Sequence, residues 1–258
     1  MSKVNIGALS LHVVTEGSPD SPALLLAHPL GADLTIWDDI APILAQKFYV
    51  VCFDARGHGG SDVPPGPYSL DDLGGDVVAL MDRLDIAKAH FIGLSMSGGV
   101  GQWLMIHAPD RLDRIVLANT AAYFPNAEGW NGRIRSARAD GMATLAPAVA
   151  QRWLTPAFRA ADPQKFAAIE KLLRANSPLG YAACCSALRD ADLRDALREA
   201  PPRPALVIVG EADPSTPPAL GEALARLLGA RIVRLHAAHL SCIEAKDAFL
   251  AAVTNFLV

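Results

Sequence analysis

The chain has 258 residues, of which 51% are apolar and 19% are charged, and its formal net charge is −4 at pH 7. This composition excludes a disordered chain, which would bury too little apolar surface to offset the entropy lost on folding. It contains no basic block, which argues against a nucleic-acid or anionic-membrane partner. The uninterrupted apolar runs are too short to span a bilayer.

The cysteines and the start of the chain indicate a cellular compartment. Cys52, Cys184, Cys185 and Cys242 show no C-x-x-C spacing and no histidine at zinc-ligand spacing, so we expect no metal site. Four cysteines in a chain of this length do not make a disulfide scaffold. The first residues lack the charged and apolar regions of a targeting segment. We therefore expect reduced thiols in a cytoplasmic protein.

Short apolar runs alternate with amphipathic stretches along the chain. The predicted strands are 9–14, 23–27, 48–53, 89–92, 114–117, 205–209 and 231–235. The predicted helices are 38–46, 69–84 with a capping box of Ser69 and Asp72, 96–108, one with Thr216 as its N-cap and Pro217 in its first turn, and one final helix containing Cys242 and Phe249. This alternation predicts a mostly parallel sheet covered on both faces.

The middle of the chain, 121–202, is helical in composition and contains no convincing strand. We interpret it as a helical insertion packed over the sheet. Such an insertion would cover the carboxyl ends of the strands, where open α/β sheets place their ligand sites.

A serine follows one of the predicted strands at a sharp turn. Strand 89–92 continues into Gly93-Leu94-Ser95-Met96-Ser97-Gly98-Gly99. A serine two residues after a glycine, between a strand and a helix, is typical of a nucleophile elbow, whose tight turn needs small neighbours. We predict Ser95 as the nucleophile because it follows the strand directly. Two alternatives are Ser97, in the frame S-x-S-x-G, and a Ser95 that only caps the helix.

A serine nucleophile needs a base, and among the seven histidines two follow the last predicted strand. His239 stands on the loop before the final helix and is the predicted base. His236 is still attached to the strand end, where a structural role fits better.

The base in turn needs an acid that orients the imidazole. Asp213 follows strand 205–209 on a loop that faces the same end of the sheet, and it is the predicted acid. Glu211 is the weaker alternative because it is closer to the strand. The other common place for this acid holds Asn119, which carries no charge.

Acyl transfer also needs two donors for the developing oxyanion. The backbone N–H of Met96, directly after the nucleophile, is one candidate. The loop after strand 23–27 reads His28-Pro29-Leu30-Gly31, and Pro29 has no N–H, so Leu30 is the second candidate. His28 is expected to fix this loop through hydrogen bonds.

Together these residues resemble the α/β-hydrolase superfamily, whose triad has the chain order Ser95, Asp213, His239. Within it, the chain most resembles the 3-oxoadipate enol-lactonases of the β-ketoadipate pathway. The similar stretches are Arg56–Ser61, Leu30–Asp38, Gly93–Leu104, His107–Ala122, Gly210–Pro218 and Ala238–Phe249. The resemblance implies the α/β-hydrolase fold, with a mostly parallel eight-stranded sheet, helices on both faces, a core of residues 1–120 and 203–258, and a helical cap of residues 121–202.

The resemblance also implies a serine hydrolase that opens a small anionic lactone or ester without a cofactor. We expect the protein to be a monomer or small homo-oligomer. Trp130-Asn131-Gly132-Arg133 is similar to a Trp-Asn-x-Arg segment of the family. Arg133 would pair with the substrate carboxylate and Trp130 would pack on its ring, since residues three apart share a helix face. The alternatives are a solvated Arg133, or Arg135 or Arg138 in its place. Trp153 is expected to line the pocket or to fill the core of the cap.

Two departures from the family pattern lie beside the predicted reaction centre. His28-Pro29 stands where the family has Asn-Ser, and Ser97 replaces a glycine. Because both departures lie next to the reaction centre, we expect them to affect which substrate is accepted. An arylesterase, a perhydrolase or a C–C hydrolase would use the same triad, and a slow-turnover ligand receptor would also retain it. A dehalogenase or an epoxide hydrolase would need Asp at the position of Ser95.

Overall fold

The computed structural model describes residues 2–258, which form one eight-stranded sheet in the order β1-β2-β4-β3-β5-β6-β7-β8. The strands are β1 (Ser2–Asn5), β2 (Ser10–Glu16), β3 (Ala23–Ala27), β4 (Tyr49–Phe53), β5 (Ala89–Leu94), β6 (Leu112–Ala118), β7 (Ala205–Gly210) and β8 (Arg231–Leu235). The pairs β1–β2 and β2–β4 are antiparallel and the other pairs are parallel. The predicted mostly parallel sheet is confirmed.

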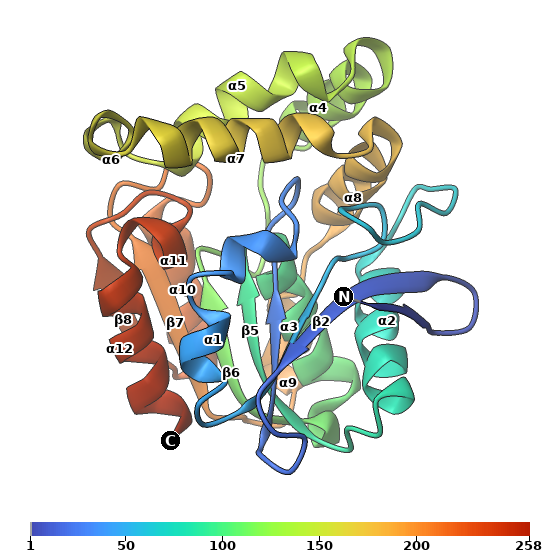
Figure 1. The fold of residues 1–258 in the computed structure, drawn as a ribbon, viewed down its shortest axis with the longest axis vertical. Coiled ribbons are helices and arrows are strands. Elements are labelled where there is room, and N and C mark those ends of the chain that lie inside the picture. Colours follow the sequence, from blue (N-terminus) through green and yellow to red (C-terminus); the bar gives the residue numbers. More distant parts are fainter. Residues whose placement is uncertain (1) are drawn as a thin grey trace.

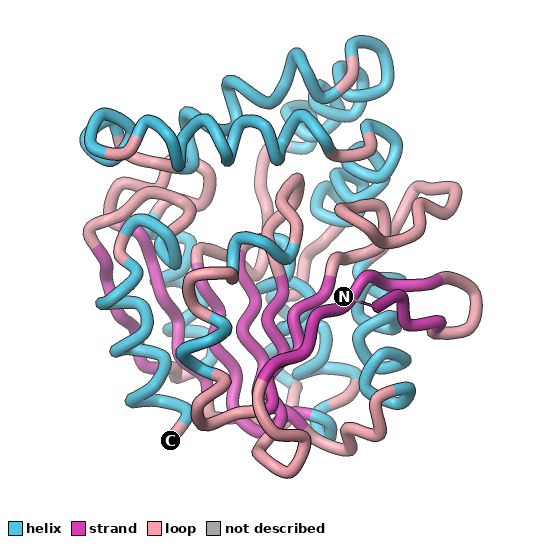
Figure 2. Tube along the Cα trace, viewed as in Figure 1, coloured by secondary structure: helices cyan, strands magenta, loops and turns pink. Residues whose placement is uncertain are grey.

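Helices cover both faces of this sheet (Figures 1 and 2). One face carries α2 (Leu70–Arg83), α3 (Met96–His107) and α10 (Pro218–Leu228), and the other carries α1 (Ala41–Leu44), α11 (Ser241–Glu244) and α12 (Lys246–Leu257). Alternate residues of the central strands belong to different cores, as Leu206 and Val207 of β7 do. Burial on both faces explains why the central strands read as continuous apolar runs.

The cap helices follow β6 in the chain. They are α4 (Ala127–Asp140), α5 (Met142–Trp153), α6 (Pro156–Ala161), α7 (Pro163–Ala175) and α8 (Pro178–Asp190). In Figure 1, α4 to α7 lie across the top of the molecule, above the sheet, where α4 packs against α8 and α5 against α7.

An isolated bridge joins Tyr123 to Asp192, where the chain leaves and rejoins the core. The next helix, α9 (Arg194–Glu199), packs against α3 and α10. The core and cap boundaries at 120 and 203 stay a prediction, and Met1 lies outside the described residues.

The structure differs from the sequence-based expectation at several elements. The predicted helix 38–46 is only the four-residue α1, which follows a 3-10 turn, Leu34–Trp37, and starts beside Pro42, a residue without an N–H. The unpredicted β1 is an edge strand whose side chains are mostly exposed, so it has no apolar alternation to reveal it. A second 3-10 turn, Pro109–Arg111, precedes β6. The capping box of Ser69 and Asp72 on α2 is confirmed.

Two neighbouring glycines of α2 have opposite surroundings. A Cβ on Gly74 would lie 2.0 Å from the ring of Trp103 on α3, whereas a Cβ on Gly75 would meet nothing within 4 Å. Trp103 is also tied to α2 by its indole N–H, which donates to Asp71 at 2.6 Å. Gly74 is therefore required for the close approach of α2 and α3, and Gly75 is not.

We expect Gly74→Ala and Gly75→Ala to change stability in opposite directions. Gly75→Ala should raise the free energy of unfolding by about 0.5–1 kcal/mol, because alanine loses less backbone entropy in a helix. Gly74→Ala should lower it by about 1–3 kcal/mol through overpacking against Trp103. Denaturant unfolding of both variants measures the difference, and equal effects would contradict this packing.

Candidate active site

Ser95 lies at the turn between β5 and α3 in a backbone conformation that side-chain-bearing residues rarely adopt, with φ 57° and ψ −113°. The turn is held from outside: the N–H of Ser95 donates to Ala118 O at 2.9 Å, and the Thr120 hydroxyl donates to Ser95 O at 2.7 Å. Its small neighbours are needed, because a Cβ on Gly93 would lie 2.2 Å from the carbonyl oxygen of Ser97. Strain of this kind marks functional positions and fits a nucleophile elbow.

Ser97 occupies a different environment. It is buried, and its hydroxyl donates to the carbonyl oxygen of His28 at 2.6 Å. Ser95 lines the same pocket as His239, whereas Ser97 lies outside it. The geometry therefore favours Ser95 over Ser97 as the nucleophile. The hydroxyl of Ser97 instead joins the elbow to the loop of Leu30.

The predicted acid and base form a buried pair. His239 Nδ1 lies 2.8 Å from Asp213 Oδ2, and both side chains are almost completely buried. Burial raises the pKa of Asp213, but the charge of His239 and the hydrogen bonds from His239, Thr216 and Asn119 outweigh it, so the pKa lies below its ordinary 3.8. The acid thus remains a carboxylate. Among residues 2–258 no hydrogen bond joins the Ser95 hydroxyl to His239, and such bonds are often completed only with substrate present.

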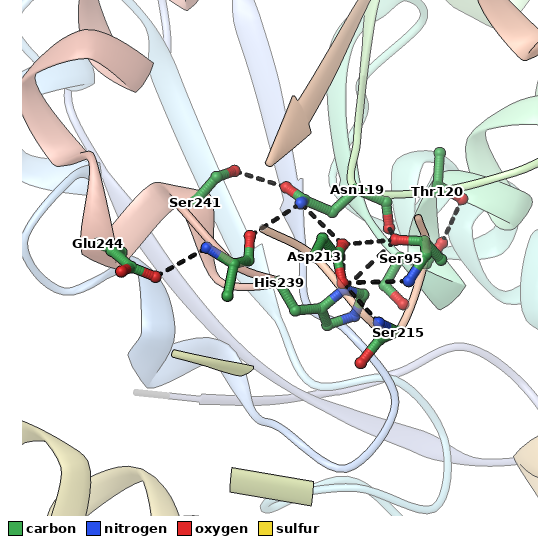
Figure 3. A network of polar contacts seen from close by, with 10 residues as sticks. Ser95, Asn119, Thr120, Asp213, Ser215, His239, Ser241 and Glu244 are labelled. Carbon is green, nitrogen blue, oxygen red and sulfur yellow. Dashed lines mark hydrogen bonds and ion pairs between the residues drawn. The ribbon is translucent and has the colours of Figure 1, made fainter. Parts of the chain in front are cut away.

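Asp213 is held by further donors (Figure 3). Its Oδ1 accepts from the N–H groups of Ser215 and Thr216, at 2.8 and 3.1 Å. The hydroxyl of Thr216 lies 2.7 Å from Asp213 Oδ2. Thr216 was expected to cap the following helix; instead α10 begins after Pro217 without a side-chain cap, because the Thr216 hydroxyl faces the carboxylate.

Asn119 also belongs to this network, although the sequence alone pointed only to its lack of charge. Its side-chain N–H₂ donates to Asp213 Oδ2 at 3.0 Å and to Ala238 O at 3.1 Å, while its Oδ1 accepts from the Ser241 hydroxyl at 2.6 Å. Asn119 therefore connects the acid to residues on both sides of His239. Its place after β6, the other common position of the acid, was the available signal.

The alternative base and acid lie away from the pocket. His236 has a side chain that is 96% exposed, and its Nδ1 pairs with the carboxylate of Glu211. These two residues form a surface ion pair and do not reach Ser95. The structure thus separates them from Asp213 and His239.

The loop of Leu30 is fixed at its backbone by two histidines. His28 Nε2 accepts from Ala55 N–H at 3.0 Å, and His58 Nε2 accepts from Gly31 N–H at 2.9 Å. The backbone hydrogen bonds of the turns and caps in residues 2–258 do not use the N–H of Leu30 or of Met96. Both N–H groups thus remain available to a ligand, as an oxyanion hole requires.

The pocket that contains Ser95 and His239 is narrow, about 50 Å³, and the cap forms its roof. Trp130, Arg133 and Trp153 all line it, as expected for substrate contacts, and the Trp153 ring lies 6.1 Å from that of His239. Trp130, Arg133 and Arg152 also line an adjoining cleft of about 440 Å³. The two spaces share Trp130, Arg133 and Arg152 as walls, so the cleft lies next to the pocket of Ser95.

Two arginines in this pocket have no carboxylate partner among residues 2–258: Arg133 and Arg152. The Arg133 guanidinium lies over the Trp130 ring at 4.7 Å, a cation–π arrangement. Burial lowers the pKa of Arg152, and the charge of Arg133 lowers it further. The like charges of Arg133 and Arg152 therefore disfavour each other in this pocket. Sequence reasoning did not single out Arg152, which is brought here by α5.

The other cations considered for the substrate are elsewhere. Arg135 is exposed and pairs with Glu128 at 2.6 Å, and Arg138 is exposed. Within residues 2–258, no group of three or more His, Cys, Asp or Glu side chains is arranged to hold a metal ion. No helix in that range is long and apolar enough to cross a membrane.

Residues 22–246 match the family model of the alpha/beta hydrolase fold. The chain belongs to the α/β-hydrolase fold family. It is 40% identical to 3-oxoadipate enol-lactonase 2 of Acinetobacter baylyi, over 95% of this chain and 92% of the relative. The enol-lactonase structure from Burkholderia xenovorans is 40% identical, with a TM-score of 0.97 over 99% of both chains. A malate-bound thermophilic esterase from Thermogutta terrifontis is 26% identical, with a TM-score of 0.93 over 100% of this chain and 98% of the other.

Replacing Ser95 and Ser97 one at a time distinguishes the roles of their two hydroxyl groups. We expect Ser95→Ala to lower kcat for ester or lactone hydrolysis by at least about a thousandfold, as loss of a nucleophile does. Ser97→Ala should lower kcat about fivefold with little change in KM, because a hydrogen bond of about 1 kcal/mol no longer aligns the Leu30 loop. Steady-state kinetics measure both; a loss in Ser97→Ala as large as that in Ser95→Ala would contradict the assignment.

The buried acceptor His58 makes stability depend on pH. Burial, and then the neighbouring His28, lower its pKa from 6.5 to about 3, so the folded protein keeps it neutral while the unfolded chain protonates it. The stabilisation that comes from keeping His58 neutral is fully present above pH 6.5 and is lost as the pH falls below that value. From pH 7 to pH 5 we expect it to reduce the free energy of unfolding by about 2 kcal/mol. Urea unfolding of His58→Gln should show a flatter pH dependence than the wild type; identical slopes would contradict this.

Proposed function

We propose that this protein hydrolyses 3-oxoadipate enol-lactone to 3-oxoadipate through an acyl-enzyme on Ser95. The observation that carries the proposal is a pocket in which Ser95 and the His239–Asp213 pair face two arginines without carboxylate partners. The enol-lactonase relatives, 40% identical over nearly the whole chain, support the choice of substrate.

In the proposed mechanism, Ser95 attacks the lactone carbonyl while His239 takes the hydroxyl proton. Asp213 orients the imidazole and stabilises its cation. The N–H groups of Leu30 and Met96 receive the oxyanion. His239 then protonates the leaving enol oxygen, and the enol tautomerises to a ketone, which draws the reaction forward. Water activated by His239 releases 3-oxoadipate and restores Ser95.

The carboxylate arm of the lactone supplies the anion that the cap arginines lack. We propose that Arg133 and Arg152 both contact this carboxylate, and that Trp130 packs on the lactone ring. Planar guanidinium groups bind carboxylates through paired hydrogen bonds. The related esterase described with bound malate, a dicarboxylic acid, supports an anion in a fold of this kind.

A second candidate function is hydrolysis of another small carboxylic ester by the same three residues. The esterase at 26% identity with a TM-score of 0.93 favours it. The pocket-lining residues of the cap, and not the triad, would decide between the two functions.

Three further points belong to the same proposal. The protein acts in the β-ketoadipate pathway, a role supported by its similarity to two proteins named 3-oxoadipate enol-lactonase. It works as a monomer or small homo-oligomer in the cytoplasm. Residues 121–202 act as the cap over a core made of the remaining chain.

The test measures the rate of lactone hydrolysis from the loss of ultraviolet absorbance. Phenyl acetate, an ester without a carboxylate, is the comparison substrate. We expect Arg133→Ala and Arg152→Ala each to lower kcat/KM for the lactone about ten- to hundredfold, since a charged hydrogen bond contributes about 1.5–3 kcal/mol. Phenyl acetate should be affected about threefold or less. The control is Arg135→Ala, whose exposed side chain pairs with Glu128 outside the pocket.

The outcomes separate the two functions. Unchanged lactone kinetics in both pocket variants, or equal losses on both substrates, would contradict carboxylate binding. Slow lactone turnover together with fast phenyl acetate cleavage by the wild type would replace the lactonase with the esterase.

A further inference from the structure

The carboxylate of Glu244 joins the loop of His239 to the cap. It is the last residue of α11, and its Oε2 accepts from the backbone N–H of Ala238 at 2.8 Å (Figure 3). The same carboxylate accepts from the backbone N–H of Thr155 at 3.2 and 3.3 Å, and from the Thr155 hydroxyl. Among residues 2–258 it forms no ion pair. Its hydrogen bonds therefore go to uncharged donors on two segments that lie far apart in the chain.

Those two segments meet on both sides of the predicted base. Ala238 directly precedes His239, and Leu240, which follows it, donates its N–H to the carbonyl oxygen of Trp153 at 3.0 Å. Trp153 ends α5, and Thr155 caps the start of α6 through its hydroxyl, which accepts from Phe158 N–H. The backbone of His239 is thus tied to the cap before and after the imidazole.

The break between α11 and α12 fits this role. One continuous final helix was expected from Cys242 onward, but the helix stops at Glu244, and Ala245 has φ −122° and ψ 45°. Cys242 before the break and Phe249 after it are both buried in the same core, so the apolar face is retained despite the break. It sets the Glu244 carboxylate within reach of Ala238 and Thr155.

We propose that Glu244 is a positioning residue that couples the docking of the cap to the alignment of His239. With the cap docked, Thr155 and Ala238 share one carboxylate, and the imidazole is held toward Asp213 and Ser95. When the 153–155 segment moves away, the His239 loop loses both of its ties to the cap. The active histidine is thus aligned only beneath a closed cap. This inference rests on the proposed function, since it assigns His239 as the base.

Glu244→Gln tests the coupling, because an amide N–H₂ would face donors where the carboxylate now accepts. We expect kcat to fall about tenfold or more with KM within about twofold, since small displacements of a catalytic group are costly. The rate at which phenylmethylsulfonyl fluoride labels Ser95, followed by mass spectrometry, should fall in parallel. Thr155→Ser keeps both donors and should retain the rates, whereas Thr155→Val loses the hydroxyl and should slow both. Glu222→Gln, at an exposed pair with Arg234, is the matched control.

Circular dichroism below the unfolding transition first establishes that each variant is folded; if Glu244→Gln is not, Thr155→Val and Thr155→Ser decide. Unchanged kcat and labelling rates in the folded variants, or a change in KM alone, would overturn the coupling. A wild type that is labelled at Ser95 but does not turn over the lactone would overturn only the proposed substrate. A wild type not labelled at Ser95 would overturn both proposals.

Discussion

The carboxylate of Asp213 is buried at the end of β7, and a buried charge is stable only where hydrogen bonds and an opposite charge replace its hydration. Those partners come from the carboxyl ends of three strands: Asn119 follows β6, Thr216 follows β7, as Asp213 does, and His239 follows β8. Satisfying this one charge therefore brings together segments from distant parts of the chain. Ser95, at the end of β5, faces the resulting site. The parallel order of these strands makes this possible, because their carboxyl ends share one edge of the sheet.

The cap supplies what the sheet edge lacks. The core places the proposed nucleophile Ser95, the proposed base His239 and two free backbone N–H groups at the carboxyl edge of the sheet, an arrangement suited to many acyl transfers. The cap adds Trp130, Arg133 and Arg152 above them and narrows the space around Ser95. In the proposed function, a cap that keeps water out of this space would strengthen the interaction of the arginines with the substrate carboxylate. In the proposed function, the core therefore carries the reacting groups and the cap selects the substrate.

The parts of the site that could be predicted are those that depend on local sequence. Ser95 follows from a strand, a glycine and a turn, and Asp213 and His239 follow from their places after the last two strands. The contacts that could not be predicted join remote segments. Arg152 reaches the pocket because α5 folds back over the sheet, and Asn119 meets Asp213 because β6 and β7, which precede them, are neighbours in the sheet. Thr216 has the local sequence of a helix cap, but its hydroxyl contacts the buried carboxylate of Asp213 and does not cap α10. The exposed edge strand β1 had no apolar pattern to reveal it.

In the proposed mechanism, the lactone carbonyl becomes bonded to Ser95 during turnover. Rapid acid quenching of the enzyme with 3-oxoadipate enol-lactone, followed by peptide mass spectrometry, tests it directly. Because the leaving enol stays attached to the acyl group when a lactone ring opens, we expect the peptide containing Ser95 to gain the mass of the whole lactone. Attachment at another residue during turnover, with the Ser95 peptide unmodified, would contradict it.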